Sequence, residues 1–296
     1  MLSPALSLAL GGCATSSSEL DDPYAPLPEV SIEEFSSVTA DLDFGTATAS
    51  TPLDPYLVGY SFEIETAFAQ ARATITGECL RGFGYESREF ATVDWETLQP
   101  LDDRQFGMWD VRAAAKFGFE PDGSRGVPQP SPALNAGQGY ADASAVCAGK
   151  RQEDPRYASI LQDLEGPQFL SDRIQGNAMA LALASPEGSA ATERFADCLR
   201  ARSLVLDPDS GYVSSEYTAK GKEAEIVAAL GEAECNRSSG RVQTLYDLRA
   251  RYEAAYMERY ESQLDAVAEQ KRSILDRLEA LIGDQHAGPR ATDGAG

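Results

Sequence analysis

Cys13 is the residue whose surroundings most clearly specify a chemical modification. The segment Leu10-Gly11-Gly12-Cys13 follows a short apolar run that begins at Leu2. This order is typical of bacterial lipoprotein signals, in which the chain is cut before the cysteine and the cysteine receives fatty acyl chains such as palmitate. The pattern predicts a chain held by lipid on the outer face of the cytoplasmic membrane, and more than one acyl chain makes such an anchor stable.

The start of the chain lacks one part of such a signal. Secretory signals begin with basic residues, but no Lys or Arg occurs before Arg72. We therefore expect the natural start to lie upstream of Met1. The alternative is that residues 1–13 are an ordinary apolar N-terminus.

The other four cysteines are expected to form two disulfides, because an even number of cysteines in an exported chain indicates pairing. They are Cys79, Cys147, Cys198 and Cys235. Four cysteines allow three pairings, and an internal repeat favours one of them, because an acidic residue followed by Cys-Leu-Arg occurs at Cys79 and again at Cys198. Pairing within each repeated unit predicts Cys79–Cys147 and Cys198–Cys235. The alternatives are four free thiols or a zinc site, which usually contains a closely spaced cysteine pair that is missing here.

The single histidine limits the chemistry that the folded part can perform. His286 lies near the C-terminus, in a segment expected to be a disordered tail. This excludes a folded Ser-His-Asp or Cys-His nucleophile and zinc bound by histidine. No glycine-rich phosphate loop or dinucleotide fingerprint occurs, so we expect no cofactor.

One acidic segment resembles the start of a calcium-binding loop. Asp207, Asp209 and Gly211 have a suitable spacing, but Tyr212 and Thr218 stand where the loop needs a glycine and a bidentate glutamate. An Asp-Pro turn is the simpler interpretation. We therefore expect no metal site.

Carboxylates offer the remaining route to catalysis, because glycosidases use two of them on either side of the scissile bond. The candidates are Glu63, Glu65, Asp94 and Glu96. In a chain with 47 acidic residues, most neighbouring pairs are expected to be solvated surface groups. Hydrolysis by a carboxylate pair is therefore the alternative function and not the favoured function.

Aromatic residues suggest a second kind of site. Tyr252, Tyr256 and Tyr260 recur four residues apart, which places them on one slowly drifting face of a helix. Such a stripe either binds a sugar or protein or packs against a neighbouring helix, and packing is the commoner use. Trp95 and Trp109 are expected in the core or in the wall of a groove.

Helical spacing of apolar residues dominates from position 56 onward. Helices are expected from about 56 to 81 and at 103–117, 139–149, 155–164, 168–185, 188–202, 215–236 and 241–282. No convincing strand alternation occurs. The fold class is therefore mainly α: a disulfide-stapled helical bundle of two related units with a long C-terminal helix.

Composition divides the chain into five expected segments. They are a lipoprotein signal at 1–13, a disordered acidic tether at 14–55, a first helical unit at 56–165, a second unit with the long helix at 166–283, and a disordered tail at 284–296. No segment after the signal is apolar and long enough to span a membrane. The net charge of −22 excludes nucleic acid as a partner, because such binding needs a basic face.

Several short motifs resemble one group of proteins. The segments Phe195–Arg200, Glu225–Val227 and Ala233–Cys235, with the long helix after them, are similar to a family of uncharacterised actinobacterial surface lipoproteins. Phe195 and Leu199 depart from the family, in which tryptophan and methionine are usual. The resemblance implies a surface location and structural disulfides, and it implies no activity.

These observations favour a membrane-anchored binding or scaffold module for a cell-wall component or a membrane protein complex, without catalysis. The alternative is a wall-acting hydrolase with a carboxylate pair. An exposed apolar face along Leu245–Leu281 would favour the first function. A cleft with two close, partly buried acids of raised pKa would favour the second.

Overall fold

The computed structural model describes residues 27–87, 93–127, 137–164, 169–207, 213 and 216–283, and all structural statements concern these residues. The fold is mainly α-helical, as predicted. The elements in chain order are η2 (Glu33–Phe35), β1 (Asp41–Asp43), β2 (Thr48–Ser50), η3 (Asp54–Tyr56), α1 (Phe62–Gly82), α2 (Val111–Phe117), α3 (Gln138–Glu153), α4 (Pro155–Leu164), α5 (Leu170–Ala184), α6 (Pro186–Ala201), α7 (Glu216–Ala219), α8 (Lys222–Ser238), α9 (Arg241–Arg259) and α10 (Glu261–Gly283).

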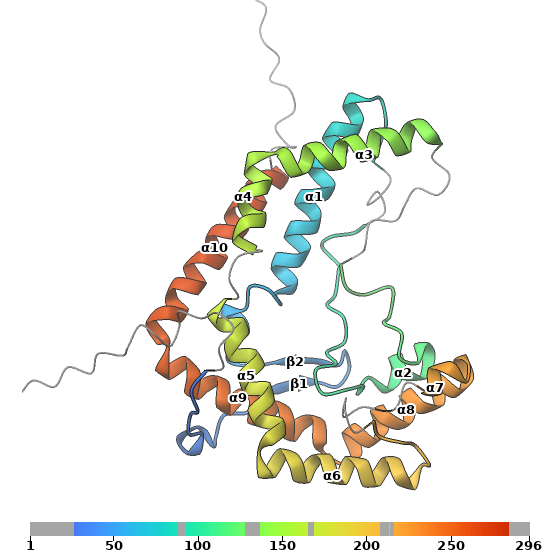
Figure 1. Cartoon of the computed structure of the whole chain (residues 1–296), viewed down its shortest axis with the longest axis vertical. Helices are drawn as coiled ribbons and strands as arrows, with labels where there is room; N and C mark the ends of the chain where they lie inside the picture. The colour runs from blue at the N-terminus through green and yellow to red at the C-terminus, as the bar shows by residue number, and fades with distance from the viewer. Residues whose placement is uncertain are drawn as a thin grey trace, which may run out of the picture.

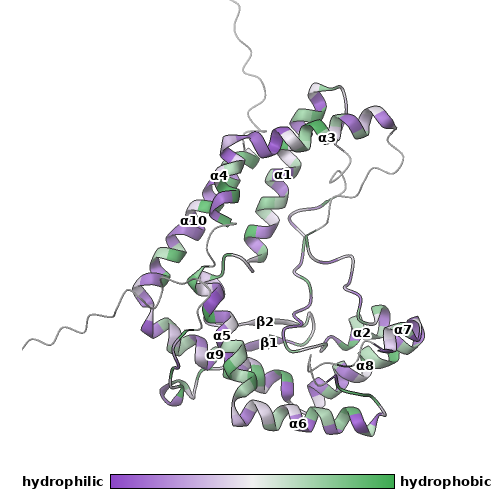
Figure 2. Ribbon diagram, in the orientation of Figure 1, coloured by the Kyte–Doolittle hydropathy of each residue, from purple (hydrophilic) through white to green (hydrophobic). Residues whose placement is uncertain are grey.

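The helices pack in two groups (Figure 1). Helices α1, α3, α4 and α10 form one group, and α5, α6, α8 and α9 form the other, in which α2 and α7 pack on α8. The β1–β2 hairpin lies beside α9 in the second group. Hydrophilic and hydrophobic residues alternate along most helices (Figure 2), as expected when one face of each helix is buried.

Both predicted disulfides are confirmed. Cys79–Cys147 joins α1 to α3, and Cys198–Cys235 joins α6 to α8. Each bridge therefore links two helices within one of the repeated sequence units.

The two predicted units share their cores. Helix α10 from the second unit packs on α1 and α4 from the first, and Ile64, Ile160, Ile274 and Leu278 are buried together there. Helix α2 from the first unit packs in turn on α8 from the second. The predicted boundary at residue 165 thus separates halves of the sequence that fold against each other.

The predicted disordered tether at 14–55 needs correction for its described part, residues 27–55. Leu27, Ala47 and Leu53 are buried in the core, and the Ala40 amide donates a hydrogen bond of 3.0 Å to Asp247 on α9. The buried residues are isolated among acidic and small ones, so they produce no periodic pattern. The segment is folded because it docks on α9, and its own sequence gives no sign of that docking.

The same segment contains the two strands that the sequence did not predict. Residues 41–43 pair antiparallel with residues 48–50. The turn between them is held by the Asp43 carboxylate, which accepts hydrogen bonds from the Gly45 amide at 2.6 Å and the Thr46 hydroxyl at 2.8 Å. Strands of three residues are too short to show a recognisable alternation.

The long C-terminal helix is interrupted once. The predicted continuous run at 241–282 forms α9 and α10, which are separated by Tyr260 with φ −117° and ψ 26°. Tyr260 and Leu264 are buried with Leu27 at this bend, and the bend directs α10 onto α1 and α4 (Figure 1). The apolar residues of α9 and α10 from Leu245 to Leu281 are consequently covered, so they form no exposed apolar face.

Candidate functional site

A loop and a short helix at residues 99–126 build a polar surface of the second helix group. The predicted helix at 103–117 begins only at Val111, because Gly107 has φ +90° and Asp110 caps the helix. One carboxylate oxygen of Asp110 accepts hydrogen bonds of 2.9 Å from the amides of Arg112 and Ala113. A side chain that caps the first turn in this way fixes the helix start.

Helix α8 holds this loop with buried polar side chains. Glu232 accepts hydrogen bonds from the amides of Met108 (2.8 Å) and Val213 (3.0 Å). Asn236 donates to the carbonyl of Phe106 at 2.9 Å, and Arg241 on α9 donates to the same carbonyl at 2.6 Å. These contacts satisfy loop backbone groups that have no partner in a regular element.

Glu232 should make folding stability depend on pH. Burial raises the pKa of Glu232 above its ordinary value of 4.5, despite the hydrogen bonds from Met108 and Val213 that lower it. The folded state therefore binds more protons than the unfolded state above pH 4.5, and the free energy of unfolding falls as pH rises through this window. We expect Glu232→Gln to lose this pH dependence and to cost about 1–3 kcal/mol, because an amide has one acceptor oxygen for two buried N–H donors.

Urea unfolding of both proteins at pH 5 and pH 8 tests this expectation. The difference in unfolding free energy between wild type and Glu232→Gln should be larger at pH 5. Other buried acids titrate in both proteins and cancel in the difference. A difference that is equal at both pH values would contradict the role given to Glu232.

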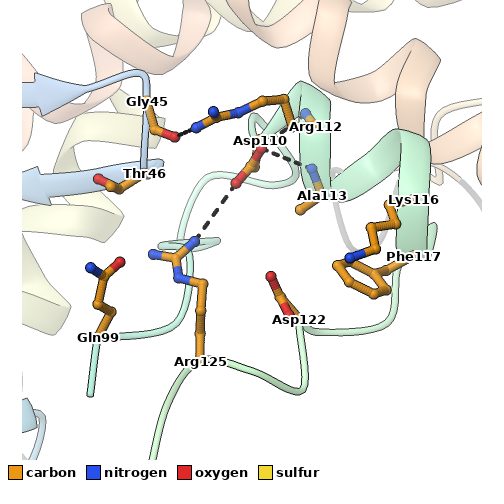
Figure 3. Close-up of a pocket in the computed structure, with 10 residues that line it drawn as sticks. All are labelled: Gly45, Thr46, Gln99, Asp110, Arg112, Ala113, Lys116, Phe117, Asp122 and Arg125. Carbon is orange, nitrogen blue, oxygen red and sulfur yellow. Dashed lines mark hydrogen bonds and ion pairs between the residues drawn. The ribbon is translucent and has the colours of Figure 1, made fainter. Parts of the chain in front are cut away.

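Three basic side chains line a pocket of about 210 Å³ beside α2. Arg112 and Lys116 extend from α2, and Arg125 reaches in from the loop after it (Figure 3). We call this site the cationic pocket. Arg112 donates to the carbonyl of Gly45 in the hairpin turn, and Arg125 donates to the carbonyl of Pro100 at 2.8 Å.

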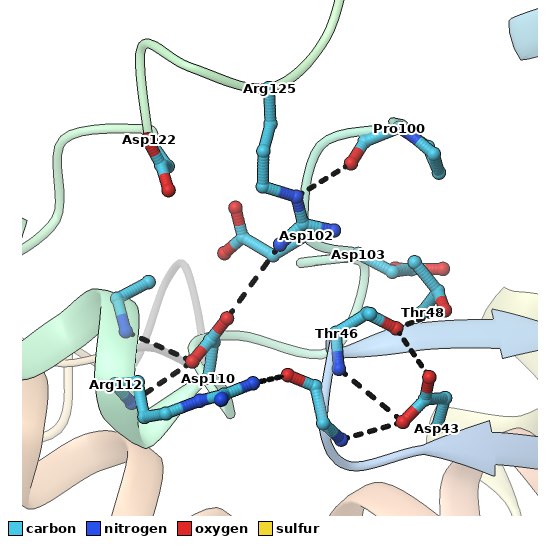
Figure 4. A network of polar contacts seen from close by, with 12 residues as sticks. Asp43, Thr46, Thr48, Pro100, Asp102, Asp103, Asp110, Arg112, Asp122 and Arg125 are labelled. Carbon is cyan, nitrogen blue, oxygen red and sulfur yellow. Dashed lines mark hydrogen bonds and ion pairs between the residues drawn. The ribbon is translucent and has the colours of Figure 1, made fainter. Parts of the chain in front are cut away.

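Two acids of the cationic pocket are held by the chain itself. Asp110 caps α2 and lies 3.7 Å from Arg125 in an ion pair (Figure 4). Asp122 accepts hydrogen bonds from the amide and hydroxyl of Ser124 at 3.0 and 2.7 Å, and these two bonds lower the pKa of Asp122. Asp122 is therefore ionised at neutral pH, and both acids act in the loop structure.

A second pocket of about 280 Å³ lies on the other side of the hairpin turn and is lined by Asp54, Asp103, Gln105 and Arg249. Burial raises the pKa of Asp103, against hydrogen bonds from Tyr246 and the Gln105 amide that lower it. Asp54 accepts hydrogen bonds of 3.0 and 2.9 Å from the amide and hydroxyl of Thr51. Contacts within the chain therefore hold both carboxylates in place.

The structure does not bring the predicted catalytic candidates together in a cleft. Glu63, Glu65, Asp94 and Glu96 are all exposed, and Glu63 lies 3.7 Å from Lys271 in a surface ion pair. Their exposure agrees with solvated surface acids.

The predicted aromatic stripe belongs mostly to the core. Tyr256 and Tyr260 are buried and stack with ring centroids 6.3 Å apart, whereas Tyr252 is half-buried. Packing, the commoner of the two uses, therefore applies to Tyr256 and Tyr260, and they form no binding surface. Trp109 is buried between the hairpin and α9, and its indole donates to the Asp103 carbonyl. Trp95 is half-buried.

Some predicted positions lie outside the described residues: Cys13, Asp209, Gly211 and His286. Within the described residues, no group of three or more His, Cys, Asp or Glu side chains is placed to hold a metal ion. No helix in the described ranges has the length and hydropathy needed to cross a membrane.

Sequence reasoning did not identify the cationic pocket. Arg112 and Lys116 have the i, i+4 spacing of one helix face. Within the helix expected at 103–117, this spacing indicates that the two basic residues are neighbours. Arg125 lies in a Gly/Pro-rich segment, and only the folded loop shows that it lines the same pocket.

No protein-family model matches this chain, and neither a curated protein nor a solved structure shows significant similarity to it.

Proposed function

We propose that this chain is an exported, lipid-anchored binding module related to actinobacterial surface lipoproteins. It would act on the outer face of the cytoplasmic membrane, with a cell-wall component or a membrane protein complex as its partner and without catalysis. Membrane contact is through the lipid alone.

The observation that carries the proposal is the complete pairing of four of the five cysteines. Cys79, Cys147, Cys198 and Cys235 form two disulfides, and such bonds persist mainly in oxidising compartments outside the cytoplasm. The pairing leaves Cys13 as the one remaining cysteine, at the position where a lipoprotein signal requires its acceptor thiol.

The polar surface at 99–126 supports binding over catalysis. Asp103, Asp110 and Asp122 accept hydrogen bonds from backbone amides close to them in the chain. These hydrogen bonds fix the orientation of the three carboxylates within the loop. The surface therefore offers fixed charges for recognition.

Replacement of Cys13 tests the anchor. The gene is expressed in a bacterial host that processes lipoproteins, and fatty acid labelling and detergent phase partitioning are measured. We expect wild type to be labelled and retained in the detergent phase, and Cys13→Ala to be unlabelled and released into the medium.

Ser16→Ala is a suitable control, because it lies near Cys13 but offers no acceptor thiol. It should behave as wild type. Retention of Cys13→Ala in the membrane fraction would reject the anchor. If the anchor is confirmed, crosslinking on intact cells, followed by identification of the captured molecules, would identify the partner.

A further inference from the structure

The cationic pocket concentrates positive charge in a strongly acidic protein. The chain carries a net charge of −22, yet Arg112, Lys116 and Arg125 line one small pocket. Arg112 and Lys116 are neighbours on the same face of α2, where like charges repel. A bound anion would relieve this repulsion.

The acids of the pocket do not fully neutralise these cations. The side chains that line it carry three positive charges and two negative ones, and the negative charges belong to Asp110 and Asp122. Each of these acids already accepts two hydrogen bonds from the chain through one oxygen. The lining alone therefore carries one excess positive charge, while Asp43 lies close enough to Arg112 to interact with it electrostatically.

Arg125 has one guanidinium N–H group that lacks a hydrogen-bond acceptor, which is a second observation independent of the charges. Its Nη2 atom is shielded from solvent and has no hydrogen-bond partner, while its Nε and Nη1 atoms are engaged by Pro100 and Asp110. A buried donor without an acceptor is unfavourable. A small rotation of the Arg125 guanidinium into the pocket would let an oxyanion supply the acceptor.

We propose that the cationic pocket binds the phosphate group of a larger ligand, with Arg112, Lys116 and Arg125 as its contacts. Arg112 and Lys116 reach the pocket from α2, and Arg125 reaches it from the loop after α2 (Figure 3). The Lys116 ammonium lies 4.5 Å from the centroid of the Phe117 ring, so it would have to leave that ring to contact a bound phosphate. The volume of about 210 Å³ is below the roughly 300–1,000 Å³ of pockets that enclose whole small molecules. The pocket therefore takes one charged group, and the rest of the ligand lies outside.

This inference rests on the proposed function, because it names the chemical group that the binding module recognises. Phosphate binding and the lipid anchor can each be disproved without the other. Phosphate binding is measured on purified protein in solution, whereas the anchor is measured in cells.

The test is isothermal titration of the purified chain with inorganic phosphate, a glycerol phosphodiester, and acetate. We expect the phosphodiester to bind at least as tightly as inorganic phosphate, and acetate to bind at least tenfold more weakly. Added sodium chloride should weaken binding, because the contacts are charged and partly exposed. No binding of either phosphate compound at millimolar concentration would overturn the proposal, as would equal binding of acetate. Binding of inorganic phosphate alone would overturn the assignment to a larger ligand.

The contacts are tested with Arg112→Gln/Lys116→Gln. Both side chains are exposed, so the variant should fold, and thermal unfolding checks this. The matched control is Lys150→Gln/Arg272→Gln, which removes one exposed lysine and one exposed arginine elsewhere. We expect the pocket variant to weaken phosphodiester binding at least tenfold and the control to leave it within twofold. Equal effects of the two double variants would show a general charge effect and overturn the site.

Discussion

Arg249→Met is expected to lower the free energy of unfolding by about 3–5 kcal/mol, because it would leave the buried Glu253 carboxylate without its counter-ion. The Arg249 Nε atom lies 2.6 Å from a Glu253 oxygen, and the two side chains are 2% and 0% exposed. Burial raises the pKa of Glu253, whereas Arg249 lowers it. Removal of the arginine would raise that pKa further, so the loss in stability should be smaller at pH 5 than at pH 8.

The measurement is urea unfolding followed by circular dichroism. Arg272→Met is the matched control, because Arg272 pairs with Glu269 in an exposed intrahelical ion pair and should cost less than about 1 kcal/mol. Arg249→Met/Glu253→Leu should recover much of the loss, since replacing a whole buried pair by apolar groups is often nearly neutral. A similar cost for Arg249→Met and Arg272→Met would show that the buried pair does not stabilise the fold.

Loss of either disulfide is expected to cost about 4 kcal/mol. The bridges close sequence separations of 68 residues for Cys79–Cys147 and 37 residues for Cys198–Cys235. In the loop-entropy description both closures restrict the unfolded chain by about 4 kcal/mol, because the effect grows only logarithmically with length. Domains are commonly stable by about 5–15 kcal/mol, so loss of both bridges should leave little net stability.

Paired Cys→Ala variants separate the two bridges, and Cys13→Ala is the control because Cys13 takes part in neither. Near-ultraviolet circular dichroism reports on the buried Trp109. Removal of Cys198–Cys235 should change this signal, because α8 holds the loop that carries Trp109, whereas removal of Cys79–Cys147 should leave it nearly unchanged. Unfolding midpoints that are unaffected by reduction would contradict the stabilising role of both bridges.

The parts of the fold that were predictable from sequence depend on local signals. The repeated Cys-Leu-Arg triplet identified the disulfide pairing. Ser185 followed by Pro186 marks the start of α6, where the serine hydroxyl accepts a hydrogen bond of 3.0 Å from the Gly188 amide. Such signals lie within a few residues of the element they control.

The parts that sequence could not supply depend on contacts between distant segments. Residues 27–55 fold because they dock on α9, and no local pattern records that docking. The loop before α2 was expected to be helical because Phe106 and Trp109 have helical spacing, but both side chains are buried from a non-helical backbone. The cationic pocket likewise depends on where Arg125 lies after folding.

In a chain anchored through Cys13, the docking of the N-terminal segment would set the distance between the folded body and the lipid bilayer. Leu27, the first residue that the structure describes, is buried and donates from its amide to Asn177 at 3.2 Å. Between an acylated Cys13 and this attachment point stand thirteen residues, Ala14 to Pro26. Fully extended they reach about 45 Å, and as a random coil about 20 Å. With so short a linker, the folded part of an anchored molecule would stay close to the lipid headgroups. It could bind only those ligands that reach the membrane surface.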